Sequence, residues 1–385
     1  MISKVTSLLT CAMLVTGASM AVSHAAEEQE TEIKDLVDTA VRPIMEKYGV
    51  PGVAVGVVVE GNSYLFNYGI ASRQTKMPVT GDTIFEIGSI SKTFVATQAS
   101  WAQVNGQISL SDKTSKYLPS MQGTEFGEVS LMHLGTHTAG GFPLQVPDEV
   151  TTDDQLMTYL QKWKPTYKAG TARTYANPSI GMLGFITAKA MNKDFGALMQ
   201  GELFPALGLK STYVEVPATK MADYAQGYTA KDDPVRVKPA VLSSEAYGVK
   251  TTATDLIRVL QANMKMVKLD GKLQQAITDT HTGYFKVGSM TQDLIWEQYA
   301  YPATLKTLQQ GNGPDMLKQL PVKQLTPPLA PRDDVWINKT GSTSGFGGYV
   351  AFVPKKRIGI VILANKNFPN VERVRIAHQV LTGLE

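Results

Sequence analysis

Residues 52–72 read GVAVGVVVEGNSYLFNYGIAS, and this stretch is the clearest structural signal in the chain. Two runs of apolar and β-branched residues flank a turn-forming cluster at 60–63, which is the pattern of a β-hairpin. Near the other end of the chain, the runs 336–341 (WINKTG), 349–353 (YVAFV) and 357–365 (RIGIVILAN) are again strand-like. We therefore expect strands from both ends of the chain to lie in one antiparallel sheet.

Helical spacing of apolar residues brackets these strands. It appears at 31–48, before Gly49 and Pro51 interrupt it, and again at 371–383. Between about 92 and 330, short helical patterns broken by glycine and proline dominate, with few strands. The sequence thus predicts an α+β fold in which terminal helices flank an antiparallel sheet. The predicted domains are a sheet domain at 26–105 and 225–385 and an inserted, mostly helical domain at 106–224.

The first 25 residues have the pattern of a secretory signal peptide. Lys4 precedes an uncharged apolar run, and Ser23-His24-Ala25 fits a small-residue cleavage site, so we expect cleavage after Ala25 or Ala26 and export to the periplasm. A retained membrane anchor is the alternative, which the shortness of the apolar run disfavours. The single cysteine, Cys11, lies in this segment, so the mature chain is expected to have no disulfide.

The charge balance argues for a small-molecule substrate. The formal net charge is 37 − 34 = +3, and removal of Lys4 leaves 36 − 34 = +2. Such a small value favours neither nucleic acid nor an anionic membrane as a partner. No motif for association is evident, so a monomer is expected.

The stretch 86–94, EIGSISKTF, contains a Ser-x-x-Lys pair. If the following residues continue a helix, Ser89 and Lys92 share one face, and Ser91 does not. Ser89 would then lie in the first turn, where the helix dipole favours a developing negative charge. Alone, the pair could equally mark an ordinary helix start, because such a spacing occurs readily by chance.

Two further motifs follow in order along the chain. The stretch 174–181, TYANPSIG, contains Tyr175 and Asn177, and the stretch 338–347, NKTGSTSGFG, contains Lys-Thr-Gly at 339–341. The second could simply be a strand exit whose glycines permit a sharp turn. The order of the three motifs, however, resembles that of the serine β-lactamases and penicillin-binding proteins.

The Tyr-Ala-Asn centre, the length and the absence of an E-x-x-L-N stretch make the chain similar to the class C β-lactamases, or cephalosporinases. The likeness extends over the whole mature chain, including LQVPDE at 144–149, EAYGVK at 245–250 and LANKNFPN at 363–370. Three positions depart from the family's pattern, namely His137, Ser342 and Phe368. Because they lie outside the three motifs, they put substrate preference in doubt rather than reaction class.

The resemblance implies hydrolysis of the β-lactam amide of cephalosporins and penicillins through an acylated Ser89, without a cofactor or metal. Lys92, Tyr175 and Lys339 would form one coupled proton-transfer system, in which Lys92 and Tyr175 both remain candidates for the base. Backbone N–H groups of Ser89 and Ser342 would hold the oxyanion. Substrate contacts are expected from Gln145, Asn177, Tyr247, Thr340, Gly341 and Asn370. Asn370 reads equally well as a helix N-cap.

Other signals are weaker. His133 and His137 are four residues apart but form no H-E-x-x-H zinc motif, and the stretch 341–345 lacks the central serine of a nucleophile elbow. A Ser/His/Asp triad is not excluded by sequence. Two rival functions share the motifs: a D-alanyl-D-alanine peptidase or esterase of the same fold, and a penicillin-binding sensor that is acylated without turnover. The motifs do not settle which β-lactams are preferred.

Overall fold

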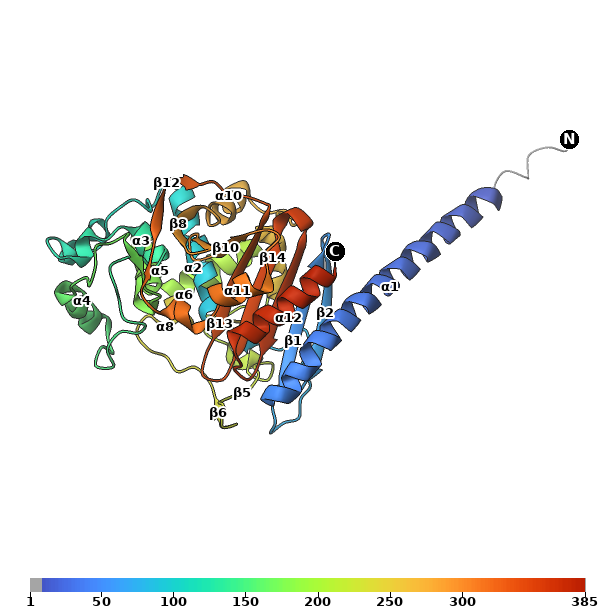
Figure 1. Cartoon of the computed structure of the whole chain (residues 1–385). Helices are drawn as coiled ribbons and strands as arrows, with labels where there is room; N and C mark the ends of the chain where they lie inside the picture. The colour runs from blue at the N-terminus through green and yellow to red at the C-terminus, as the bar shows by residue number, and fades with distance from the viewer. Residues whose placement is uncertain (1–8, 385) are drawn as a thin grey trace.

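The computed structural model describes the backbone of residues 9–384 and the side chains of residues 27–384. Within these residues, the largest element is a nine-stranded antiparallel sheet (Figure 1). Its strands, in spatial order, are β12 (Lys323–Leu329), β8 (Gly283–Val287), β9 (Met290–Gln292), β10 (Glu297–Ala300), β13 (Val335–Ser342), β14 (Gly347–Val353), β15 (Ile358–Ala364), β1 (Gly52–Val59) and β2 (Asn62–Gly69). Two-residue strands form three further pairs: β3 (Phe85–Glu86) with β7 (Lys250–Thr251), β4 (Ala172–Arg173) with β11 (Leu320–Pro321), and β5 (Gly227–Tyr228) with β6 (Pro234–Val235).

The two ends of the chain meet at β1. This strand pairs with β2 through the predicted hairpin and with β15 from the other end of the chain, with Val53 opposite Ala364 and Val59 opposite Ile358. The turn of the hairpin contains Glu60 and Gly61, both with positive φ. The prediction that both ends build one antiparallel sheet is therefore confirmed.

Alternate residues of β1 enter two separate hydrophobic cores. Val53, Val55 and Val57 pack with residues of the two terminal helices, whereas Ala54 and Val58 join the larger core on the opposite face. Side chains of a strand point alternately to its two faces, so a strand that is covered on both faces must be apolar throughout. This explains why GVAVGVVV shows no alternation of polar and apolar residues.

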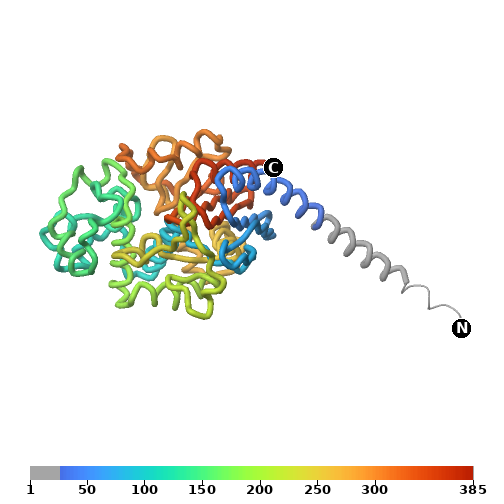
Figure 2. The backbone as a smooth tube through the Cα atoms, turned by 90° about the horizontal axis from the view of Figure 1, so that it is seen from below, coloured from blue at the N-terminus to red at the C-terminus, as the bar shows by residue number. Residues whose placement is uncertain are grey.

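Helices cover both faces of the sheet. Those in the described residues are α1 (Leu9–Tyr48), α2 (Ser91–Val104), α3 (Leu131–Gly135), α4 (Asp153–Lys162), α5 (Asn177–Ala190), α6 (Phe195–Leu198), α7 (Phe204–Leu207), α8 (Ser243–Ala246), α9 (Ala253–Asn263), α10 (Gly271–Asp279), α11 (Leu305–Gly311) and α12 (Asn370–Gly383). The terminal helices α1 and α12 pack together on one face, and α9 lies on the other face against β1 and β15. In Figure 2 the green segments that include α3 and α4 lie at the end of the molecule far from the chain termini.

The structure differs from the sequence-based expectation in two places. Four strands of the sheet, β8, β9, β10 and β12, fall between 92 and 330, where few strands were expected. They are short or interrupted, β9 having three residues and β10 four, and so leave no periodic signal. The predicted helix at 31–48 is the end of the longer α1. The domain boundaries remain a prediction.

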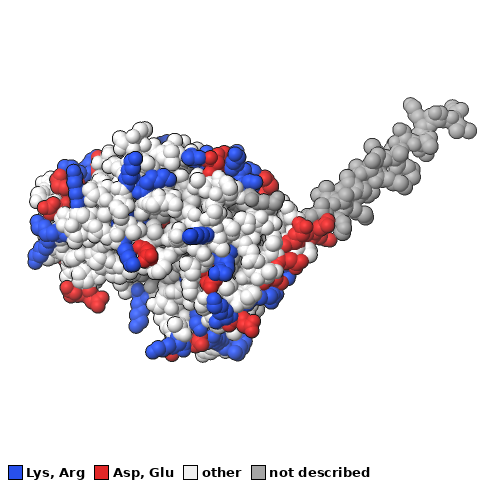
Figure 3. Space-filling model, viewed as in Figure 1, with Lys and Arg blue, Asp and Glu red and all other residues white. Residues whose placement is uncertain are grey.

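The predicted signal peptide, residues 1–25, lies outside the part of the chain whose side chains are described. Over the described residues, no helix is both long enough and apolar enough to cross a bilayer. On the face shown in Figure 3, acidic and basic side chains are largely interspersed over the body of the molecule.

Candidate active site

Ser89 and Lys92 lie at the start of the central helix, α2. Ser89 sits in the 3-10 turn η1 (Gly88–Ile90), which leads directly into α2. The Lys92 ammonium group is fully buried and donates hydrogen bonds to Ser89 Oγ at 2.9 Å and to the Ala246 carbonyl oxygen at 2.8 Å. Ser91 is turned away, and its Oγ accepts a hydrogen bond from Val249 N at 3.0 Å. The geometry therefore links Lys92 to Ser89 and gives Ser91 a structural contact.

The end of β13 crosses the Ser89 turn at very close range. A Cβ atom placed on Gly341 would come within 1.9 Å of the Ile87 carbonyl oxygen. A Cβ atom on Gly88, which has a left-handed φ of +50°, would come within 2.5 Å of Ser342 N. Both positions require glycine, because only a residue without a side chain lets two backbones approach so closely. The Ser342 peptide is thereby held beside the peptide that precedes Ser89.

Tyr175 stands between the two ammonium groups. It follows the short strand β4 and precedes α5, so its backbone is fixed on both sides. Lys92 Nζ lies 5.3 Å and Lys339 Nζ 5.2 Å from the centroid of the Tyr175 ring. Lys339 lies on β13 and is almost completely buried. Three distant motifs thus converge on one polar cluster.

The buried charges shift the pKa values of this cluster. Burial raises the pKa of Tyr175, but the positive charges of Lys339 and Lys92 and a hydrogen bond with Ser89 outweigh it and lower the value to about 8. Burial also lowers the pKa of Lys92 to about 8, and the like charge of Lys339 acts in the same direction. Both groups can therefore exchange protons near neutral pH, and they titrate as a coupled pair.

Two charged residues that the sequence analysis missed complete the cluster. Arg173, on β4, lies with its guanidinium carbon 5.5 Å from the centroid of the Tyr175 ring. The buried Glu297 carboxylate lies between the two neighbouring cations, 3.5 Å from Arg173 Nη2 and 3.8 Å from Lys339 Nζ. It also accepts a hydrogen bond from Asn338 Nδ2. Only the position of Arg173, two residues before Tyr175, could have suggested either residue.

His137, one of the departures from the family's pattern, packs on the tyrosine. The two ring centroids are 4.3 Å apart. The His137 carbonyl oxygen accepts from Thr174 N at 3.0 Å, and His137 Nδ1 accepts from Ala176 N at 3.3 Å. Burial, followed by the positive charges of Arg173, Lys92 and Lys339, holds the pKa of His137 well below its usual range. His137 therefore packs against the Tyr175 ring as a neutral imidazole and accepts hydrogen bonds from the residues on either side of Tyr175.

A cavity of about 290 Å³ opens above this cluster. Nine of the eleven predicted site residues line this cavity: Ser89, Gln145, Tyr175, Asn177, Lys339, Thr340, Gly341, Ser342 and Asn370.

Lys92 and Tyr247 are the two that do not line the cavity. Lys92 lies beneath its floor and contacts Ser89 from below, as described above. Tyr247 is half-buried at the C-terminal end of α8, directly after Ala246, and its predicted contact with substrate stays a prediction. Asn370 is the first residue of α12 and makes no capping hydrogen bond, so its side chain does not serve as the alternative N-cap.

The cavity offers two kinds of unused hydrogen-bonding groups. The Asn177 Oδ1 atom is buried and has no partner within the described residues. Strand β13 pairs with β10 only from Val335 to Asn338, so over the described part of the chain its outer edge from Lys339 to Ser342 has no partner strand. An extended peptide-like ligand could pair with such an edge.

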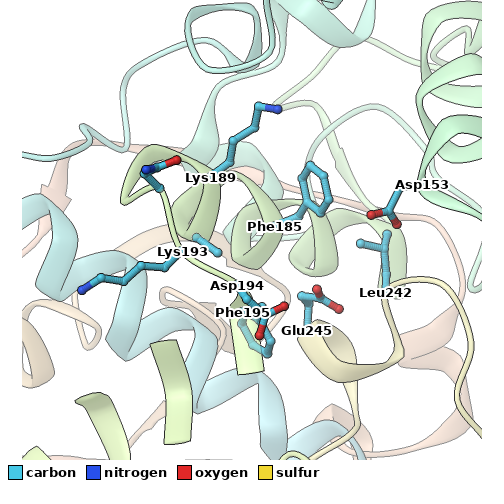
Figure 4. Close-up of a pocket in the computed structure, with 10 residues that line it drawn as sticks. Asp153, Phe185, Lys189, Lys193, Asp194, Phe195, Leu242 and Glu245 are labelled. Atoms are coloured by element: carbon cyan, nitrogen blue, oxygen red, sulfur yellow. The ribbon is translucent and has the colours of Figure 1, made fainter. Parts of the chain in front are cut away.

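A second cavity, of about 380 Å³, is lined by residues of α4, α5, α6 and α8 and of the segments that join them (Figure 4). None of the predicted site residues lines it. Figure 4 shows the Asp153 and Glu245 carboxyl groups facing a common space, with Lys189 and Lys193 extending away from it. Burial, together with the charges of Asp153 and Asp194, raises the pKa of Glu245 to about 7. Among the described side chains, no group of three or more His, Cys, Asp or Glu could hold a metal ion.

Comparison with known proteins identifies the family. The family model described as Beta-lactamase matches residues 37–385. A β-lactamase from Lysobacter lactamgenus is 53% identical over 346 residues, which is 90% of each chain. A β-lactamase/D-alanine carboxypeptidase structure from Pseudomonas syringae has a TM-score of 0.90 at 52% identity and covers 91% of this chain and 98% of its own. A class C β-lactamase solved in complex with cefoxitin has a TM-score of 0.90 at 49% identity and covers 92% of this chain and 99% of its own.

The converging motifs, the fold and these similarities lead to the same result. The Lysobacter lactamgenus relative matches 90% of the chain, and the range that the family model matches spans the three motifs that meet at Ser89. The chain therefore belongs to the β-lactamase family, in the branch of the class C serine enzymes.

Proposed function

We propose that this class C β-lactamase acts in the periplasm and opens the lactam ring of cephalosporins and penicillins through an ester on Ser89. β-Lactam hydrolysis follows from the family, whereas the compartment, the preferred substrates and the residue roles are proposals. The observation that carries the roles is the 2.9 Å hydrogen bond from Lys92 Nζ to Ser89 Oγ, beside a phenol flanked by two ammonium groups.

In the acylation step, Ser89 Oγ attacks the lactam carbonyl carbon and the carbon–nitrogen bond of the ring breaks. The serine proton passes to the coupled pair of Tyr175 and Lys92, and from there to the ring nitrogen that leaves. The pKa values of about 8 for both groups support this role, because a base works best when its pKa lies near the working pH.

In the deacylation step, water attacks the ester carbonyl carbon and gives a proton to the same pair, and the ester carbon–oxygen bond then breaks as the pair passes that proton to Ser89 Oγ. In both steps the carbonyl oxygen becomes an oxyanion. The proposed donors are the backbone N–H groups of Ser89 and Ser342, and the close approach of the Ser342 peptide to Gly88 supports this placement. The free edge of β13 and the unpaired Asn177 Oδ1 would hold the substrate's side-chain amide.

Matched serine substitutions test the nucleophile. Ser89→Ala should abolish both turnover and covalent labelling by a penicillin, as measured by intact-protein mass spectrometry. Ser91→Ala should keep the label, because the Ser91 hydroxyl accepts a hydrogen bond from Val249 N and does not line the cavity. Labelling of the Ser89→Ala protein would assign the nucleophile elsewhere.

The alternative function is that of a D-alanine carboxypeptidase, since the similar protein from Pseudomonas syringae carries both names. The same acyl-enzyme would form in both cases, and the two functions differ in how fast water removes it. Excess chromogenic cephalosporin separates them: many turnovers per enzyme indicate a lactamase, and a single stoichiometric burst indicates a peptidase or a sensor.

The proposed export rests on residues 1–25. Mass spectrometry of the protein recovered from the periplasm should give a chain that begins at Ala26 or Glu27. Recovery of the uncut chain in the membrane fraction would instead support the retained anchor.

A further inference from the structure

A buried carboxylate three residues before Ser89 joins three separate segments. Glu86, on β3, is 1% exposed. Its Oε1 accepts hydrogen bonds from Tyr224 Oη at 2.6 Å and from Val237 N at 2.7 Å. Its Oε2 accepts a hydrogen bond from Thr343 Oγ1 at 2.6 Å. A buried carboxylate is costly unless hydrogen bonds satisfy it, and here three donors do so.

The contact with Thr343 is the one that reaches the candidate site. Thr343 directly follows Ser342, at the point where the pairing of β13 with β14 ends, with Ser342 opposite Gly347. Beyond that pair, Thr343 N donates to the Phe346 carbonyl oxygen and closes a turn. Sheet pairing therefore fixes one side of Ser342, and the side chain of Thr343 ties the other side to Glu86.

The carboxylate and the nucleophile belong to the same rigid segment. Ile87 N donates to the Val249 carbonyl oxygen, and η1 follows at once. The Gly88 backbone contacts the Ser342 peptide, and this contact sets the distance between the Ser89 turn and the end of β13. Close contact between the two backbones does not by itself prevent the end of β13 from shifting along the Ser89 turn. The short hydrogen bond from Thr343 to Glu86 fixes its position in that direction.

We propose that Glu86 is a positioning residue for the reaction, because its hydrogen bond to Thr343 holds the Ser342 N–H at the distance from Ser89 that oxyanion binding needs. This inference rests on the proposed oxyanion role of Ser342. Oxyanion donors act by being fixed before charge develops, so a small displacement of one donor lowers the rate without unfolding the protein.

The other donors to the same carboxylate provide a control. Tyr224 Oη and Thr343 Oγ1 each give Glu86 one hydroxyl hydrogen bond of 2.6 Å. Tyr224→Phe and Thr343→Val thus each remove one hydroxyl from one buried carboxylate. A merely structural role for Glu86 predicts that both variants lose stability and activity in parallel.

The experiment compares Thr343→Val, Thr343→Ser and Tyr224→Phe with the wild type. It measures the thermal midpoint, the single-turnover acylation rate with a chromogenic cephalosporin, and the inhibition constant of phenylboronic acid, whose tetrahedral adduct on a serine mimics the oxyanion. We expect Thr343→Val to acylate about tenfold to a hundredfold more slowly and to bind the boronate more weakly by a similar factor. Thr343→Ser, which retains the hydroxyl, should restore both, and Tyr224→Phe should leave both within about twofold despite a similar loss of stability.

Two results would overturn the proposal: wild-type acylation and boronate binding in Thr343→Val, or equal losses in Thr343→Val and Tyr224→Phe. A wild-type enzyme that is acylated but fails to turn over would overturn the proposed lactamase function instead. Because acylation and boronate binding are measured directly, that failure leaves the test of Glu86 intact.

Discussion

The two cavities described above both bring like charges close together, but the charges around Tyr175 are buried whereas Asp153 and Asp194, beside Glu245, are exposed. Around Tyr175, two ammonium groups bring the pKa of a phenol down to about 8. Around Glu245, burial and two aspartates bring the pKa of a carboxyl up to about 7. Only the first cluster has a hydroxyl that receives a hydrogen bond from one of the shifted groups. A shifted pKa therefore points to a function when it stands beside a group that can react.

The largest effect should follow from removing the phenol hydroxyl at the first cavity. Tyr175→Phe is expected to lower kcat/KM by about tenfold to a hundredfold or more, because a proton acceptor within the coupled pair is lost. Tyr167→Phe is the matched control, since Tyr167 also has a partly buried hydroxyl near this segment, which donates to Thr174 Oγ1 at 2.7 Å. Near-normal rates in Tyr175→Phe would move the role of base to Lys92.

The next largest effect is expected from removing a positive charge at the same cavity. Lys339→Gln removes a cation that lowers the pKa of both Tyr175 and Lys92, so both values should rise. Whichever group is the base, the acidic limb of the kcat/KM profile should move upward by about one pH unit. The exposed Lys323 on β12 supplies the control Lys323→Gln, which should leave the profile in place. A downward shift in Lys339→Gln would contradict the role of charge.

Substitution of Glu245 at the second cavity should change the stability of the protein rather than its reaction rate. The pKa of Glu245 is raised from 4.5 to about 7, so the folded protein holds a proton that the unfolded chain has already released, and stability falls as pH rises through this window. The glutamine side chain of the variant Glu245→Gln does not titrate, so the variant lacks this pH dependence. It should equal the wild type in stability near pH 4 and exceed it by about 1–2 kcal/mol at pH 8, allowing for partial exposure.

Denaturant unfolding at several pH values measures this difference. The acylation rate of Glu245→Gln should stay within about twofold of the wild type, because Glu245 lines the second cavity and not the first, although the carbonyl oxygen of the next residue, Ala246, accepts a hydrogen bond from Lys92. A pH-independent difference in stability would show that Glu245 is ionised in the folded protein at neutral pH.

The contrast also shows what the sequence could predict. The sequence predicts Ser89, Lys92, Tyr175 and Lys339 as catalytic candidates because each lies in a short motif whose order along the chain carries information, and the structure brings these four residues together. The apolar runs of β1 and β15 predicted the centre of the sheet, since continuous burial requires continuous apolar sequence.

What the sequence left out depends on tertiary contacts. Glu297 lies on β10, a four-residue strand in a region expected to be mostly helical, and nothing in EQYA marks its carboxylate as the partner of Arg173 and Lys339. Glu86 stands within the quoted stretch EIGSISKTF, but its partners Tyr224 and Thr343 lie 138 and 257 residues away. A pattern of neighbours cannot reveal such pairs.

The smallest predicted effect separates the charges that raise the Glu245 pKa. Asp153→Asn removes a like charge that faces Glu245, so the Glu245 pKa should fall by about half a unit, as expected for a partly screened interaction. Asp154→Asn is the matched control, because both aspartates lie in the first turn of α4 and both lose the same favourable interaction with the helix dipole.

Carboxyl NMR titration of Glu245, assigned with Glu245→Gln, measures the shift in each variant. Asp153→Asn should lower the Glu245 pKa and Asp154→Asn should leave it unchanged, although both variants lose similar helix stability. If the two variants moved the Glu245 pKa equally, a general change in net charge rather than the carboxylate facing the cavity would explain the shift. Burial would then be the main cause of the titration near neutral pH at the second cavity, while the first cavity would still owe its titration to specific neighbouring charges.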